Sequence, residues 1–316
     1  MFKYIVKNTL LIIPTLLGVL LLVFTINHFT PGDPVIMLLG IDYTQEQYDE
    51  TAAELGVDQP FFVQFYNYLK GIVTKFDFGK SYKTKLPVMN DIAARVPVTL
   101  KLGLLTCLVS VLIGIPFGII SATKQYSVFD YIVTFVSLFF SSVPGFWLSM
   151  MMILLFSLQL NWLPASGMDT WKSYIMPVIG GSVSSIAMLT RQTRSSMLEV
   201  IRQDYIRTAR AKGVSESTVV WKHALRNALI PVVTVVGMQL GVIMGGSTII
   251  ETIHSFPGMG TLLLTGINNK DYPTIQTIVL LLAGVICLMN MLVDIAYGFV
   301  DPRIRVGGKK RRKQSQ

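Results

Sequence analysis

The sequence predicts an all-α integral membrane protein with six transmembrane helices. Of its 316 residues, 52% are hydrophobic and only 14% are charged, which is too apolar for an ordinary water-soluble domain. A helix needs roughly 20 apolar residues to cross about 30 Å of hydrocarbon. Six stretches free of charged residues approach or exceed that length: 8–32, 102–123, 131–168, 173–190, 227–250 and 272–293.

The first stretch is interpreted as a transmembrane helix and not as a cleaved signal peptide. Lys3 and Lys7 precede it, as basic residues precede the apolar core of a signal peptide. The apolar run is longer than such a core, however, and Thr-Pro-Gly-Asp-Pro at 30–34 is not a small-residue cleavage site. Pro14 lies inside this helix, where neighbouring helices can satisfy the carbonyl that proline leaves free.

The segment that follows the first span is predicted to contain helical and irregular parts. Thr44 is placed to cap a helix at its start and Gly56 to end it. Residues 61–70 carry Phe, Tyr and Leu at helical spacing, and an irregular, extended stretch follows. Such aromatic faces usually indicate packing or a membrane-interface belt, and less often a solute site.

The connections between the later spans differ in length. Only 124–127 join the second and third spans, which predicts an antiparallel pair of helices. The third stretch is longer than one span and is expected to include an outer loop around 161–164. The fourth is short, and we expect Trp171 or residues beyond Arg191 to extend it.

Small residues occur inside several spans. Gly114 and Gly118 are spaced so that another helix can approach closely, either in a second membrane subunit or within this chain. Cys107 and Cys287 lie in separate spans and belong to no metal-ligand or CxxC spacing. We interpret both cysteines as packing residues.

The distribution of charge predicts the orientation in the membrane. The net charge is +9, and residues 191–226 carry eight Lys or Arg against three acids, while 301–316 carry seven against one. Because basic residues gather on the cytoplasmic side, this loop and both termini are predicted in the cytoplasm. The basic residues are expected to contact lipid headgroups, and no nucleic-acid partner is predicted. The chain then divides into a first span (1–29), an extracytoplasmic segment (30–96), spans two to six with the loop at about 191–226 (97–300), and a basic cytoplasmic tail (301–316).

The loop at 203–213 reads as an amphipathic helix. Tyr205, Ile206 and Ala209 share one side, and Gly213 can adopt the left-handed conformation that closes a helix. Ser215 can then cap a second short helix running toward Leu225. Two short helices bent at a glycine are suited to docking into a groove on another protein.

This loop resembles the EAA loop of ABC importer permeases, in the subfamily that imports peptides and nickel. The resemblance covers essentially the whole chain because further strings of that subfamily occur in order. They stand at 31–34 (Pro-Gly-Asp-Pro), 77–81 (Asp-Phe-Gly-Lys-Ser) followed by 87–88 (Pro-Val), 95–100 (Arg-Val-Pro-Val-Thr-Leu), 223–228 (His-Ala-Leu-Arg-Asn-Ala), 257–260 (Pro-Gly-Met-Gly), 271–273 (Asp-Tyr-Pro) and 301–303 (Asp-Pro-Arg). Each string is weak alone, and their order and spacing make the match specific.

The loop departs from the general EAA pattern in a way that resembles the peptide subfamily. Where the pattern expects Glu-Ala-Ala and then Gly, this chain has Arg207, Thr208, Ala209 and Gly213. The resemblance implies that the loop couples to a cytoplasmic ATPase. The implied coupling residues are Asp204, Tyr205, Arg207, Thr208, Ala209, Arg210, Lys212 and Gly213. An alternative is that Arg207 and Arg210 only contact lipid headgroups.

A second candidate site lies between the fifth and sixth spans. One proline and two glycines impose a tight turn there, predicted on the outer side with Phe256 and Met259 at the rim. We expect this turn to gate the entrance or to contact a binding protein. Its residues are Phe256, Pro257, Gly258 and Met259.

The resemblance implies a type I ABC importer permease fold and a defined set of partners. These are a homologous second permease, two ATP-binding subunits, an extracytoplasmic solute-binding protein and a peptide substrate, with the chain in the bacterial plasma membrane. The chain has no G-x-x-x-x-G-K-[ST] phosphate loop. It is therefore predicted to bind no cofactor and to be no enzyme, with ATP and Mg on partner subunits.

Other functions remain open. The same machinery could carry nickel or another small solute, since nothing in the sequence identifies the solute. A secondary transporter would couple to ions through charged groups near the membrane midplane, which the central spans lack. An intramembrane enzyme would need a catalytic cluster, but His28, His223 and His254 are scattered along the chain.

Overall fold

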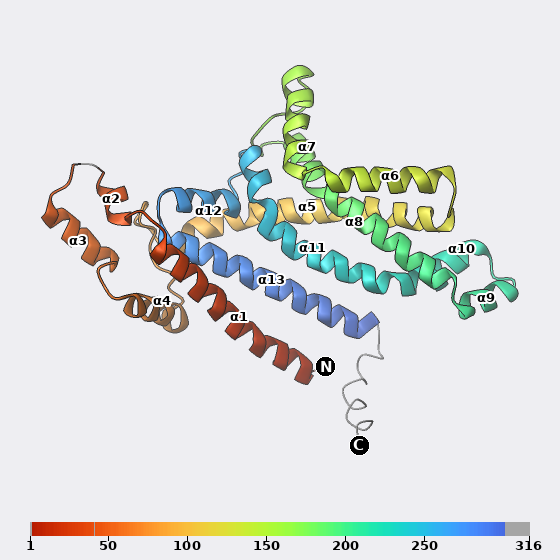
Figure 1. The fold of residues 1–316 in the computed structure, drawn as a ribbon, viewed down its shortest axis with the longest axis horizontal. Coiled ribbons are helices and arrows are strands. Elements are labelled where there is room, and N and C mark those ends of the chain that lie inside the picture. The colour runs from red at the N-terminus through yellow and green to blue at the C-terminus, as the bar shows by residue number, and fades with distance from the viewer. Residues whose placement is uncertain (1, 41, 301–316) are drawn as a thin grey trace.

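The computed structural model describes residues 2–40 and 42–300, and within them the chain is helical (Figure 1). The predicted basic tail, 301–316, lies outside the described residues. The long helices are α1 (Phe2–Phe29), α5 (Val88–Thr123), α8 (Ile175–Ile201), α11 (Leu225–Ile253) and α13 (Tyr272–Val300). The shorter ones are α2 (Pro34–Leu39), α3 (Gln45–Leu55), α4 (Phe61–Lys75), α6 (Val128–Ser142), α7 (Gly145–Met152), η1 (Ile153–Gln159), η2 (Trp171–Tyr174), α9 (Asp204–Ala211), α10 (Glu216–Thr218), η3 (Val219–Ala224) and α12 (Met259–Asn268).

The predicted spans correspond to helices of the structure. Five helices are long and apolar enough to cross a membrane, and α6 with α7 and η1 makes a sixth if this bent pair is counted as one span. The fourth span runs from Trp171 to Ile201, so it is extended at both ends. The fold class predicted from the sequence, an all-α membrane protein, is confirmed.

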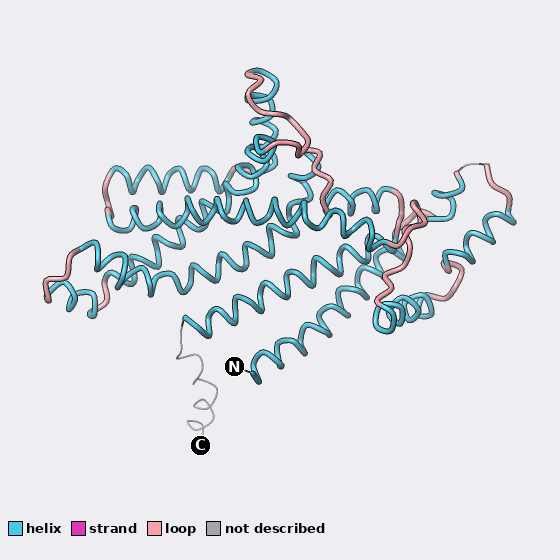
Figure 2. The backbone as a smooth tube through the Cα atoms, turned by 180° about the vertical axis from the view of Figure 1, so that it is seen from behind, coloured by secondary structure: helices cyan, strands magenta, loops and turns pink. Residues whose placement is uncertain are grey.

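The bundle is built around α5 and α8, which pack along much of their length. A side chain at Gly118 would bring its Cβ within 2.7 Å of the Thr190 carbonyl oxygen, and one at Gly114 within 2.8 Å of Leu189 Cβ. The two glycines therefore serve packing within the chain, which decides between the alternatives left open by the sequence. Around this pair, α11 covers α5 and α8, α13 covers α11, and α1 lies on α13 (Figure 2).

The third span is bent, which the sequence analysis did not predict. The helices α6 and α7 meet at 94°, so α7 runs across α8 at a steep angle and its continuation η1 extends away from the bundle (Figure 1). The bend falls where Pro144 precedes α7 and supplies its N-cap position. Proline restrains the residue before it to extended backbone, and Val143 has ψ 121°.

The segment between α1 and α5 forms a separate group of short helices at one end of the bundle (Figure 1). Thr44 and Gln47 make the capping box that begins α3, and Gly56 ends this helix with φ 67°, as predicted. The ring of Phe24 on α1 packs edge-on against Phe61 and Phe65 of α4, at 5.4 and 5.3 Å between centroids. These contacts hold α4 against the first span.

The two ends of the bundle differ in the elements they carry. The short helices α2–α4 lie at one end and α9 lies at the other (Figure 1). The first turns of α1 and the last turns of α13 are close to each other and point away from α2–α4. The arrangement therefore separates the two candidate sites along the bundle axis.

Candidate functional site

The helix α9 is attached to the bundle by one buried side chain. Ile206 is fully buried in a cluster with Met197 of α8, Val219 and Ala224 of η3, and Ile119 of α5. Ala209 packs against the same cluster, one turn further along α9. Two residues of the predicted apolar side, Ile206 and Ala209, thus face the bundle, whereas the third, Tyr205, is exposed and was wrongly assigned to that side.

The outward face of α9 is polar and largely basic. Asp204, Arg207, Thr208, Arg210 and Lys212 are all exposed, as is Tyr205, whose hydroxyl accepts a hydrogen bond from Asn227 Nδ2 at 2.9 Å. Because Arg207 and Asp204 are 3.8 Å apart and mostly solvated, their ion pair contributes little to stability. Arg207 is therefore available to a partner.

The turn after α9 has the conformation predicted for it. Gly213 has φ +75°, and its N–H donates to the Arg210 carbonyl at 3.0 Å. The Arg210 guanidinium closes the same turn by a bidentate contact with Glu216, at 3.0 Å from Nε and 2.6 Å from Nη2. The implied coupling residues therefore form one short helix, α9, and the turn that ends it.

The helix after this turn is longer than the sequence analysis predicted. It begins at Glu216 but does not end near Leu225, since α10, η3 and α11 follow one another without a break. Ser215 makes no side-chain hydrogen bond to the helix N-terminus and bonds Thr218 Oγ1 instead, at 2.9 Å. No glycine or proline interrupts 216–230, so nothing in this stretch stops the helix.

In the turn between α11 and α12 Phe256, Gly258 and Met259 are buried while Pro257 is exposed, so the prediction that Phe256 and Met259 lie at the rim was wrong. Phe256 is 1% exposed and packs edge-on against Tyr174, with 5.1 Å between ring centroids. Met259 is 5% exposed and lies among Val88, Ile92 and neighbouring apolar side chains. The cause is α12, which folds this turn back onto α5 and α13.

A buried carboxylate that the sequence analysis missed organises this turn. Glu251 is fully buried and accepts hydrogen bonds from Thr99 Oγ1 at 2.7 Å and Ser247 Oγ at 2.8 Å. Its other oxygen accepts the N–H groups of Gly260 and Thr261, at 2.8 and 3.2 Å, in the first turn of α12. Glu251 thus satisfies donors that a helix N-terminus leaves free. The signal in the sequence was an acid shortly before a Gly-Met-Gly helix start.

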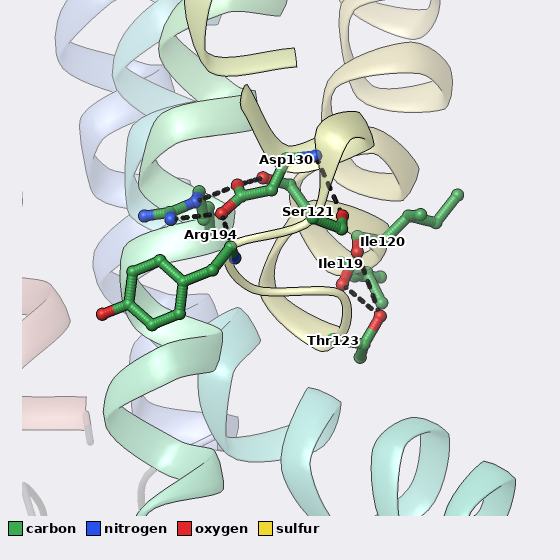
Figure 3. Close-up of polar contacts among 8 residues, drawn as sticks. Ile119, Ile120, Ser121, Thr123, Asp130 and Arg194 are labelled. Carbon is green, nitrogen blue, oxygen red and sulfur yellow. Dashed lines mark hydrogen bonds and ion pairs between the residues drawn. The ribbon is translucent and has the colours of Figure 1, made fainter. Parts of the chain in front are cut away.

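A second buried carboxylate, Asp130, pairs with Arg194 (Figure 3) and fixes the α5–α6 connection at the end of the bundle that carries α9 (Figure 1). The Arg194 guanidinium donates twice to Asp130, from Nε at 2.7 Å and Nη2 at 2.8 Å. Ser121 Oγ and the Tyr126 N–H donate to the same carboxylate, and the Asp130 side chain is 3% exposed. This network ties three helices together, and it explains how Arg194 can lie within the fourth span.

The helical architecture defines a multi-pass integral membrane protein. The chain belongs to the family described as binding-protein-dependent transport system inner membrane component, whose profile matches residues 114–306. The profile of the N-terminal part of these membrane components matches residues 1–103. The resemblance to ABC importer permeases is thereby confirmed.

Individual relatives and solved structures agree with this assignment. The dipeptide transport system permease protein DppB of Alkalihalophilus pseudofirmus is 39% identical, over 96% of this chain and 100% of its own length. The glutathione transport system permease protein GsiC of Escherichia coli K12 is 40% identical, over 96% and 99%. A chain of the MetNI methionine ABC transporter, solved in an inward-facing conformation, has a TM-score of 0.58 at 20% identity and covers 67% of this chain and 97% of its own, which shows a shared fold.

Proposed function

We propose that this chain is the peptide-conducting permease subunit of a bacterial ABC importer. Relatives that transport dipeptides and glutathione support a peptide substrate. In this proposal the chain pairs with a homologous permease, an extracytoplasmic binding protein delivers the peptide, and two subunits carrying ATP and Mg supply the energy.

The observation that carries the proposal is the construction of α9. One buried isoleucine, Ile206, holds the helix on the bundle, while Arg207, Thr208 and Lys212 face outward without a strong intramolecular partner. A short helix with a fixed base and a free polar face is suited to docking into a groove of an ATPase, so that movement of either partner is passed to the other.

We infer that α9 and both termini lie in the cytoplasm and that α2–α4 lie outside. The excess of basic residues at 191–226 and 301–316 supports this orientation. The common direction of the first turns of α1 and the last turns of α13, away from α2–α4, is consistent with it (Figure 1). The plasma membrane of a bacterium is then the location.

The orientation predicts a labelling pattern. Asn268, the last residue of α12, and Lys212, which follows α9, are both exposed, and these two helices lie at opposite ends of the bundle (Figure 1). A cysteine replacing Asn268 is expected to react with an impermeant maleimide added to intact cells, whereas one replacing Lys212 should react only after permeabilisation. The native Cys107 and Cys287 are replaced by alanine beforehand. The reverse pattern would overturn the proposed topology.

Replacing Gly213 tests whether α9 couples to the ATPase. No atom outside the turn would touch a Cβ at this position, so a substitution acts only through the backbone, which has φ +75°. A β-branched residue there costs about 1–2 kcal/mol, which shifts the loop population by about five- to thirtyfold. Gly213→Val is therefore expected to lower both ATPase co-purification and peptide uptake severalfold while membrane abundance stays constant.

Asparagine provides the matched control at this position. It accepts the left-handed conformation more readily than other residues, so Gly213→Asn should retain most ATPase binding and uptake. Immunoblots of the membrane fraction, co-purified ATPase and uptake are measured on the same cells. Wild-type values for Gly213→Val would end the assignment of this turn as the coupling element.

A further inference from the structure

A cavity of about 860 Å³ lies between the α2–α4 segment and the bundle. Its walls come from α1, α3, α4, the loop at 77–85 and the first turn of α13. These elements gather at the end of the bundle opposite α9 (Figure 1). The volume falls in the range of about 300–1,000 Å³ that is common for small-molecule sites in proteins.

The cavity wall is fixed by a buried aspartate. Asp271 is 4% exposed and accepts hydrogen bonds from Ser81 Oγ at 2.6 Å, the Tyr82 N–H at 3.0 Å and Thr274 Oγ1 at 2.8 Å. The loop at 77–85 is thereby fastened to the start of α13. Two of the strings noted in the sequence, 77–81 and 271–273, meet at this carboxylate.

A third string joins the same wall from the end of α1. Lys270 Nζ donates to the Pro31 carbonyl at 2.8 Å, and Tyr272 Oη donates to the Gly32 carbonyl at 3.3 Å. Segments that are far apart in the sequence thus form a cross-linked frame around the cavity. Such a frame lowers the entropy that a binding site loses when its ligand binds.

Two amide side chains on the wall have no protein partner. Asn27 is 7% exposed, and its Nδ2 makes no hydrogen bond within the described residues. Gln276 is 5% exposed, and no hydrogen bond of its side chain occurs in the part of the chain that the structure describes. Since buried polar groups in folded proteins are nearly always hydrogen-bonded, the unpartnered Asn27 amide indicates a polar ligand, and the Gln276 amide, which is not fully buried, lies on the same wall. A peptide group offers the acceptor and donor that they need.

Some charged groups of the cavity already have partners. Asp33 accepts from Tyr48 Oη at 2.6 Å, and Glu54 lies 3.3 Å from Lys85 Nζ. The first contact lies within the segment that carries α2–α4. The second joins that segment to the loop at 77–85. Two other charged residues of the wall, Lys80 and Asp77, form no ion pair among the described residues.

The remaining charges have opposite signs. Lys80 has no acid within 4.0 Å among the described residues. One oxygen of Asp77 accepts the Gly79 N–H at 2.9 Å, and the other has no partner in residues 2–40 and 42–300. A cavity with an uncommitted cation, an uncommitted anion and free amides is complementary to a zwitterion that contains peptide groups.

We propose that this cavity binds a short free peptide through its backbone. The peptide carboxylate pairs with Lys80, its ammonium group with Asp77, and its peptide group bonds Asn27 and Gln276. Because these contacts involve only the backbone, the site accepts peptides of varied sequence. The proposal rests on the proposed peptide-uptake function and adds a peptide site on the permease chain itself.

The test measures binding of one dipeptide to the full-length chain in lipid nanodiscs, without the binding protein. The probes are Ala-Phe with a free carboxylate and its C-terminal amide, titrated by calorimetry. The wild-type chain is expected to bind the free acid about tenfold more tightly than the amide, because one charge-assisted hydrogen bond is lost. Lys80→Met should bind both forms equally, and Asn27→Leu should bind both more weakly.

The control for Lys80 is a neighbouring lysine of the same loop. Lys83 is exposed and does not line the cavity, so Lys83→Met should retain the tenfold preference. Lys80 is also exposed, and its replacement leaves the buried core unchanged. The proposal fails if no dipeptide binds, or if Lys80→Met retains the preference for the free acid.

Two further results separate this proposal from others. If the cavity variants bind dipeptide normally but capture less of the purified binding protein, the cavity is a protein-docking site and the proposal is wrong. Uptake of Ala-Phe by cells tests the proposed function separately. Uptake without binding to the isolated chain rejects only the cavity site, whereas a transporter that takes up no peptide rejects the proposed function as well.

Discussion

Replacing Glu251 by alanine is expected to lower the free energy of unfolding by about 3 kcal/mol or more. The change leaves the Thr99 hydroxyl, the Ser247 hydroxyl and the N–H groups of the first turn of α12 without their acceptor inside the protein. Each buried donor without a partner costs about 1–3 kcal/mol, and relaxation recovers part of the sum. Thermal melting of the detergent-solubilised chain, followed by size-exclusion chromatography, measures the loss.

The neighbouring Thr252 is the matched control. It is exposed on the same helix, and its hydroxyl bonds only the Thr248 carbonyl one turn earlier. Thr252→Ala should therefore melt within error of the wild type. Glu251→Gln keeps one acceptor and should lie between the two. A Glu251→Ala chain as stable as wild type would show that the carboxylate does not hold α12 in place.

Removing Asp130 is expected to have the second largest effect. Asp130→Ala leaves the Arg194 guanidinium without a counter-charge, and unpairing a buried charge costs about 3–5 kcal/mol. The Arg194 side chain is 28% exposed, so water compensates part of this and we expect a loss of about 2 kcal/mol. The same melting assay applies.

A double variant separates the loss of the pair from the loss of packing. If the unpaired charge is the main cost, Asp130→Ala combined with Arg194→Met should be more stable than Asp130→Ala alone. Glu199→Ala is the control because Glu199 is exposed and has no ion pair among the described residues. Equal melting of Asp130→Ala and Glu199→Ala would contradict the expectation.

The spans were predictable because they depend on a property that the sequence displays directly, the spacing of charged residues. The limits of that rule appear where a charge lies inside a helix. Lys101 lies within α5, 4.1 Å from the centre of the Tyr174 ring, and Arg191 and Arg194 lie within α8. Such charges are accommodated by partners on other helices, and a single sequence does not show those partners.

The candidate sites were predictable to different degrees, because some of their features depend on local sequence and others on contacts between distant residues. The left-handed turn at Gly213 is local, so the residue type was sufficient to predict it. The burial of Phe256 depends on α12 folding back onto α5 and on Glu251 contacting Thr99, which is 152 positions away in the chain. The 94° bend was partly predictable. Pro144 is visible in the sequence, but the angle depends on how α7 packs against α8.

The unbroken helix after Gly213 has a mechanical consequence. The α11 helix contains 29 residues, with Pro231 inside it, and at about 1.5 Å per residue it is about 43 Å long. One end packs in the cluster around Ile206, and the other carries Glu251, which holds the start of α12. A tilt of about 1° at the first end displaces the other by about 0.7 Å, a sizeable fraction of a hydrogen-bond length. A small movement of the α9 region is therefore passed along α11 to the start of α12.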